Sequence, residues 1–118
     1  MKTTYRRLST KRKVARADAL AHLQKLLSEH DFVTAALTES QLAIETYQNE
    51  LNTSQLHFAA PGAHMSSVFN HRRRLATELA KEKTKLVALR QKRSSLESDI
   101  NHAKEAVANA QRGVKMVR

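Results

Sequence analysis

Apolar residues recur along this chain at alternating intervals of three and four, first over residues 19–51 and again over residues 68–117. In the first segment the repeat is filled by Leu23, His30, Leu37, Ile44 and Leu51 at one position and by Ala19, Leu26, Val33, Ser40 and Tyr47 at the other. In the second it is filled by Val68, Leu75, Glu82, Leu89, Leu96, Ala103, Ala110 and Val117 and by Leu79, Leu86, Arg93, Ile100, Val107 and Val114. A seven-residue repeat this long is typical of helices that pair along a narrow apolar seam. The pattern predicts two long helices.

The two segments are separated by Pro61-Gly62, which contains the only proline and one of the two glycines of the chain. Proline cannot continue a helix through its own position, and glycine is a poor helix former. Because the break lies near the middle of the chain, the two arms match in length. We therefore predict an all-α fold, a single antiparallel two-helix coiled-coil hairpin over residues 1–118. Its first helix is expected at about 4–53, its loop at about 54–66 and its second helix at about 67–117.

Each predicted arm has two polar residues in its seam, Ser40 and His30 in the first and Glu82 and Arg93 in the second. Ser40 and Glu82 lie equally far from Pro61 along the chain, and His30 and Arg93 lie almost equally far. Folding about the break would therefore place polar residues near polar residues. Buried polar groups cost free energy unless they have partners, and a polar seam residue can fix the register of a coiled coil. An assembly of several chains could supply other partners at these positions.

The net charge of +10 is unevenly distributed along the chain. Residues 1–16 carry +7, residues 17–60 carry −5, residues 61–93 carry +7 and residues 94–118 carry +1. An acidic first arm and a basic second arm complement each other if they pair in a hairpin. The charge distribution is therefore an argument for the hairpin that does not depend on the proline. The basic segment at the start has no such partner within the chain. Because positive charge opposes the dipole at a helix N-terminus, an acidic partner would stabilise this segment.

The remaining composition argues against an enzyme. The only glycines are Gly62 and Gly113, so no glycine-rich phosphate loop exists, and no nucleophile–base arrangement is visible. Cysteine is absent, which excludes disulfides and thiol metal sites. His57, His64 and His71 recur every seven residues across the break, and we expect solvated histidines there rather than a metal site. We expect no catalytic residue, no cofactor and no membrane-spanning helix, since no run of about 18 apolar residues occurs.

Two surfaces could bind a partner. Phe58, Met65 and Phe69 lie around the bend, where they either plug the end of the coil or form a binding tip. A basic stretch of the second arm could follow the phosphates of a nucleic acid; it consists of Arg72, Arg73, Arg74, Lys81, Lys83, Lys85, Arg90 and Lys92. Aromatic stacking groups are missing among these residues, and the pairs Glu78–Lys81 and Glu82–Lys85 favour a solvated charged face. A basic nucleic-acid-binding coiled coil and a self-assembling structural coiled coil remain the alternatives to an adaptor.

Two stretches of the chain resemble a known family. One is the opening Tyr5-Arg6-Arg7-Leu8 followed by Lys11-Arg12-Lys13, and the other is Tyr47-Gln48-Asn49-Glu50-Leu51 just before the bend. Together they resemble the central stalk proteins of type III secretion export ATPases, in flagellar and injectisome systems, which are small antiparallel coiled-coil hairpins. The resemblance implies a non-enzymatic cytoplasmic protein, peripheral to a membrane-bound secretion apparatus. Such a protein inserts into and stimulates a hexameric export ATPase, links it to the export gate in the membrane, and binds secretion chaperones.

The resemblance also implies two sites. The ATPase-binding site would be the basic end of the hairpin, formed by Arg6, Arg7, Lys11, Arg12, Lys13 and Arg16. The export-gate site would map to Tyr47 and Leu51 before the bend and to Leu75 and Leu79 after it. Those four residues also occupy seam positions of the repeat, so a role in the core competes with a role in binding.

Overall fold

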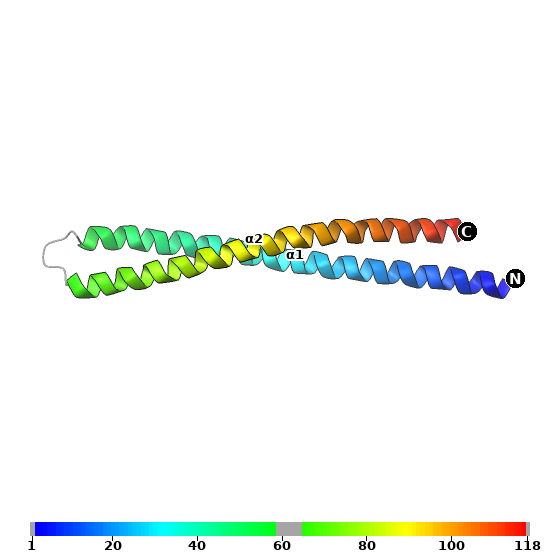
Figure 1. Cartoon of the computed structure of the whole chain (residues 1–118), viewed down its shortest axis with the longest axis horizontal. Helices are drawn as coiled ribbons and strands as arrows, with labels where there is room; N and C mark the ends of the chain where they lie inside the picture. The colour runs from blue at the N-terminus through cyan, green and yellow to red at the C-terminus, as the bar shows by residue number, and fades with distance from the viewer. Residues whose placement is uncertain (1, 59–64, 118) are drawn as a thin grey trace. The chain divides into compact units, whose positions relative to one another are not determined.

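The structure, a computed structural model, describes residues 2–58 and 65–117, and side-chain burial over residues 6–54 and 66–113. The described chain consists of helix α1 (Lys2–Phe58) and helix α2 (Met65–Val117), coloured blue to green and green to red in Figure 1. It divides into two compact units, a terminal unit of Met1–Phe32 with Arg93–Arg118 and a central unit of Val33–Lys92. Each unit pairs a segment of α1 with an antiparallel segment of α2. The predicted all-α, antiparallel two-helix fold is confirmed.

The core of each unit is the predicted seam. The buried apolar residues are Leu26, Val33, Leu37, Leu75, Leu79, Leu96, Ile100, Ala103 and Val107, and all nine occupy positions of the seven-residue repeat. The other predicted seam residues whose burial is described are buried or half-buried, without exception. Fully burying a leucine or valine side chain stabilises a fold by about 1.5–3 kcal/mol. The paired helices are therefore held by one narrow row of such contacts rather than by a broad core.

Helix α1 ends later than the sequence analysis placed its end. It continues through residues 54–58 to Phe58, because no proline or glycine occurs before Pro61. Weak helix formers such as Thr53 cost only a few tenths of a kcal/mol each in a helix. The Thr53 hydroxyl Oγ1 also donates to the backbone oxygen of Asn49 at 2.9 Å, so its polar group is satisfied within the helix.

Helix α2 begins at Met65, two residues before the predicted start at residue 67. Residues 59–64, which include Pro61-Gly62, lie outside the described part of the chain. The predicted break therefore lies between the end of α1 at Phe58 and the start of α2 at Met65.

The first polar layer of the seam lies in the central unit. Ser40 is 1% exposed, and its hydroxyl Oγ donates to the backbone oxygen of Glu82 at 3.4 Å. The Glu82 carboxylate turns instead toward its own helix, where Oε1 lies 3.8 Å from Nζ of Lys85. The predicted pairing of Ser40 with Glu82 is confirmed, with the backbone of Glu82 as the acceptor.

The second polar layer lies in the terminal unit. The ring nitrogen Nε2 of His30 lies 3.2 Å from Oε1 of Glu97, and Nε of Arg93 lies 3.8 Å from the same oxygen. His30 and Arg93 therefore meet through a shared carboxylate. Glu97, which the sequence analysis did not single out, links the two helices at this layer.

The predicted charge complementarity of the acidic first arm and the basic second arm does not take the form of ion pairs between Asp or Glu of α1 and Lys or Arg of α2 in the described part of the chain. Three ion pairs between Lys or Arg and Glu occur there, and all lie within α2, including the predicted pairs Glu78–Lys81 at 3.5 Å and Glu82–Lys85 at 3.8 Å. The contact between His30 and Glu97 crosses between the helices, and its carboxylate comes from α2. The acidic residues of α1 are instead exposed to solvent, as are most basic residues of α2. Their charges are available to partners outside the chain.

Candidate functional site

The basic segment near the start of α1 is the first candidate site. It belongs to the terminal unit, and its six predicted binding residues are Arg6, Arg7, Lys11, Arg12, Lys13 and Arg16. All of them are exposed except Arg16, which is half-buried. A shallow hollow of about 390 Å³ is lined by Arg6, Arg7, Thr10 and Lys11. Three cations and a hydroxyl group around one hollow suit an anionic group such as a carboxylate.

Two residues of this segment approach the partner helix: Arg12, although it is exposed, and Arg16, which is half-buried. Nη1 of Arg12 donates to the backbone oxygen of Gly113 at 2.9 Å, and so ties α1 to the end of α2. A cation favours a helix C-terminus because it interacts with the carbonyl end of the helix dipole. The Arg16 atom Nε is buried and has no hydrogen-bond partner. The segment therefore separates into Arg12 and Arg16, which lie against α2, and four outward basic residues.

The sequence contains a signal for this separation that the sequence analysis missed. Counting back seven residues from the seam residues Ala19 and Leu23 reaches Arg12 and Arg16. The repeat thus continues into the basic segment with arginine in place of an apolar residue. Because the aliphatic stem of arginine can pack along apolar surface, such a substitution is compatible with a seam position.

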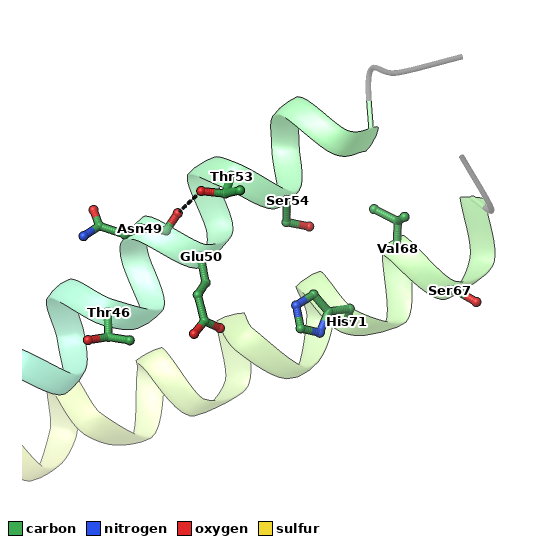
Figure 2. Close-up of a pocket in the computed structure, with 8 residues that line it drawn as sticks. All are labelled: Thr46, Asn49, Glu50, Thr53, Ser54, Ser67, Val68 and His71. Atoms are coloured by element: carbon green, nitrogen blue, oxygen red, sulfur yellow. Dashed lines mark hydrogen bonds between the residues drawn. The ribbon is translucent and has the colours of Figure 1, made fainter. Parts of the chain in front are cut away.

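The second candidate site is a groove of about 620 Å³ between the helices of the central unit. It is lined by Thr46, Asn49, Glu50, Thr53 and Ser54 of α1 and by Ser67, Val68 and His71 of α2. Figure 2 shows Glu50 extending from α1 toward α2, with His71 and Val68 on the opposite wall. One carboxylate and one imidazole do not make a metal centre. In the part of the chain that is described, no group of three or more His, Cys, Asp or Glu residues could hold a metal ion.

The predicted histidine series is only partly visible. His71 is exposed at the edge of this groove. His64 and the side chain of His57 lie outside the described residues. The expectation of solvated histidines therefore holds for His71 and stays a prediction for the other two.

A hollow of about 650 Å³ lies elsewhere in the central unit, close to the predicted export-gate residues. It is lined by Gln48, Leu51 and Asn52 of α1 and by Phe69, Arg72, Arg73 and Ala76 of α2. Of the four predicted residues only Leu51 lines this hollow. Leu75 and Leu79 are 5% and 8% exposed, and Tyr47 is half-buried. These exposures favour a core role for Leu75 and Leu79.

Phe69 is an exposed aromatic residue, with 60% of its surface accessible. It therefore does not plug the seam. Together with Arg72 and Arg73 it lines the hollow of about 650 Å³ that Leu51 also lines. The side chains of Phe58 and Met65, which the sequence analysis grouped with it, lie outside the described part. For Phe69 the exposure favours the binding-tip interpretation over the plug.

The basic residues of α2 in the central unit form the remaining surface. Arg73, Arg74, Lys81, Lys83, Lys85, Arg90 and Lys92 are exposed, and Arg72 is half-buried. Neither described helix contains a stretch apolar enough and long enough to cross a membrane.

Comparison of the chain with protein-family models, with curated proteins and with solved structures gives no match. No relative therefore adds to the argument about function. The argument rests on the surfaces described above, and the resemblance to export-ATPase stalk proteins stays a prediction from the sequence.

Proposed function

We propose that this protein is a non-enzymatic stalk or adaptor of a type III secretion system. In this proposal the basic start of α1 enters the pore of the hexameric export ATPase and stimulates it. The observation that carries the proposal is the group of four outward basic residues, Arg6, Arg7, Lys11 and Lys13, in a segment of charge +7 without a single acidic residue. The identity of the partner comes from the sequence resemblance.

The geometry supports this function in two ways. Clustered exposed charge steers a complementary acidic partner and speeds association. Arg12 fastens this part of α1 to α2 through Gly113, so that the four outward residues are presented by a paired helix instead of a frayed end. A paired helix loses less conformational entropy on binding than a disordered arm would.

The second part of the proposal concerns the link to the export gate. The hollow that contains Leu51, Phe69 and Arg73 offers apolar surface beside positive charge and is open to a partner. It is a better candidate for gate contact than Leu75 and Leu79, which are buried. The protein would act in the cytoplasm beside the membrane-bound apparatus, with secretion chaperones as further partners.

The test compares two variants that lose the same charge. Arg6, Arg7, Lys11 and Lys13 are all changed to Gln in the first variant, and the exposed α2 residues Arg74, Lys83, Arg90 and Lys92 in the matched control. The first variant should bind the cognate export ATPase at least about fourfold more weakly, since exposed charge contacts contribute about 0.2–1 kcal/mol each. ATPase stimulation should fall with binding, while helicity by circular dichroism stays unchanged. Equal stimulation by both variants would refute the proposal.

Nucleic-acid binding is the second candidate, and the exposed basic residues of α2 are the observation that favours it. The same two variants discriminate between the functions. If the protein binds DNA through phosphates, the α2 variant should lose affinity, and the affinity of the unaltered chain should fall steeply with salt. Salt-dependent DNA binding together with intact ATPase stimulation by the first variant would replace the stalk function with this one.

A further inference from the structure

Helix α1 of the central unit carries an apolar residue between two carboxylates on its outer side. Leu42 is 57% exposed, and Glu39 and Glu45, three residues before and after it, are exposed as well. A helix turns by about 100° per residue, so these three residues lie on the side opposite the seam, which runs through Ser40 and Ile44. None of the ion pairs among the described residues involves Glu39 or Glu45. We refer to Glu39, Leu42 and Glu45 as the acidic face.

Helix α2 of the same unit carries a groove whose charged residues are positive instead of negative. It has a volume of about 520 Å³ and is lined by Arg73, Ala76, Thr77, Ala80, Lys81 and Thr84. The hydroxyls of Thr77 and Thr84 donate to the backbone oxygens four residues earlier, at 2.9 Å and 3.1 Å. Because those polar groups are satisfied within the helix, the threonines can offer their methyl groups to a partner. We refer to this surface as the basic groove.

The cations of the basic groove are free to rearrange. Lys81 is in a 3.5 Å ion pair with Glu78, but its side chain is 70% exposed, and exposed pairs of this kind contribute little. Arg73 is in none of the ion pairs among the described residues. No carboxylate lines the groove.

We propose that the acidic face of one chain docks into the basic groove of a second copy of the same chain. The Leu42 side chain would pack against Ala76 and Ala80, whose small side chains permit close approach of a helix. Glu39 and Glu45 are about 9 Å apart along their helix, and Arg73 and Lys81 about 12 Å apart along theirs. Flexible side chains span this difference, so both carboxylates reach a cation. Charged side chains that form no ion pair with the other helix of their own chain would thus form ion pairs with the neighbouring chain.

The position of the two surfaces determines the kind of assembly. Within the central unit the seam lies between α1 and α2, so the acidic face and the basic groove point away from it on opposite sides. The contact is therefore head-to-tail, and each bound copy leaves one surface free for the next. Association of this kind is open-ended and depends on protein concentration. It also weakens with salt, because the pairs are exposed and screened within about 10 Å at 0.1 M ionic strength.

Two variants of the full chain, each with one surface removed, test the proposal by sedimentation velocity. The first is Glu39→Gln, Leu42→Gln and Glu45→Gln, and the second is Arg73→Gln and Lys81→Gln. All five positions are exposed, so helicity should persist. Each variant alone should be monomeric at concentrations where the unaltered chain associates in low salt. An equimolar mixture should form a 1:1 dimer and nothing larger, because only one complementary pair of surfaces remains.

The control variant Lys83→Gln and Arg90→Gln removes two positive charges outside the groove, as many as the second variant removes within it, and should associate as the unaltered chain does. A chain that is monomeric at every concentration in low salt would overturn the proposal. So would a mixture that stays monomeric, either variant associating normally, or association that requires an added polyanion or another protein. The test does not involve the ATPase, so its outcome is independent of the stalk function.

Discussion

The sharpest test of the seam compares two leucines five residues apart on the same helix. Leu37 is 3% exposed and Leu42 is 57% exposed. Changing leucine to alanine removes three carbon groups, worth about 0.8 kcal/mol each when buried. A residual cavity adds to that cost, but a seam between two helices is open at its sides and can partly close. We expect Leu37→Ala to lower the free energy of unfolding by about 2–3 kcal/mol and Leu42→Ala to change it by less than about 0.5 kcal/mol.

Thermal unfolding followed by circular dichroism measures this difference directly. For a domain of this size the Leu37→Ala change corresponds to a fall in melting temperature of roughly 8–12 °C. Leu42→Ala should shift it by about 3 °C or less. Thermal unfolding should be measured in high salt at low protein concentration, because these conditions suppress the proposed association through Leu42. If the two variants lost the same stability, the two leucines would not differ in burial, and the antiparallel seam described here would be wrong.

Three further predictions concern contacts between the helices. Cysteines in place of the seam residues Ala19 and Ala103 should crosslink within one chain under mild oxidation; bands only at twice the mass on a non-reducing gel would instead indicate pairing between chains. Glu82→Leu should keep or raise the melting temperature, because this carboxylate is 19% exposed and has only a 3.8 Å contact with Lys85. A lower melting temperature would show that its charge is well paired. Arg12→Gln removes the hydrogen bond to Gly113 and should cost about 0.5–1 kcal/mol. Amide hydrogen exchange should then accelerate near residues 6–16, and unchanged protection there would contradict the tie between the helices.

The seam could be predicted from the sequence because its signal is local and repeated. Val33 and Leu37 on α1 and Leu75 on α2 are buried where the seven-residue period places them. Ser40 and Glu82 could be paired in advance as well, because their equal distance from the break fixes which residues meet in an antiparallel arrangement. Which atoms of Ser40 and Glu82 form the hydrogen bond could not be predicted. The hydroxyl of Ser40 bonds to a backbone oxygen, and which group accepts depends on side-chain rotamers that no pattern contains.

The candidate sites were less predictable, because a periodic pattern gives the face of a residue but not its exposure. Leu51 and Leu75 share the same seam pattern, yet Leu51 is half-buried and lines a hollow, whereas Leu75 is 5% exposed. The basic segment presented a different difficulty. Its arginines look equivalent in composition, and only their place in the repeat distinguishes Arg12 and Arg16 from the outward residues.

The charge distribution shows most clearly where composition misleads. The composition suggests that an acidic arm and a basic arm neutralise each other once they pair, but neutralisation by contact also requires the charges to flank the seam. Glu39 and Glu45 lie on the outer side of α1, and Arg73 and Lys81 line a groove on α2 that carries no α1 residue. The hairpin therefore leaves the hydrogen-bonding groups of these four side chains exposed. Acidic residues on the outer side of one helix and basic residues on the outer side of the other can therefore bind another molecule as readily as they stabilise the fold. The position of each charged residue within the seven-residue repeat determines which of these two roles it can have.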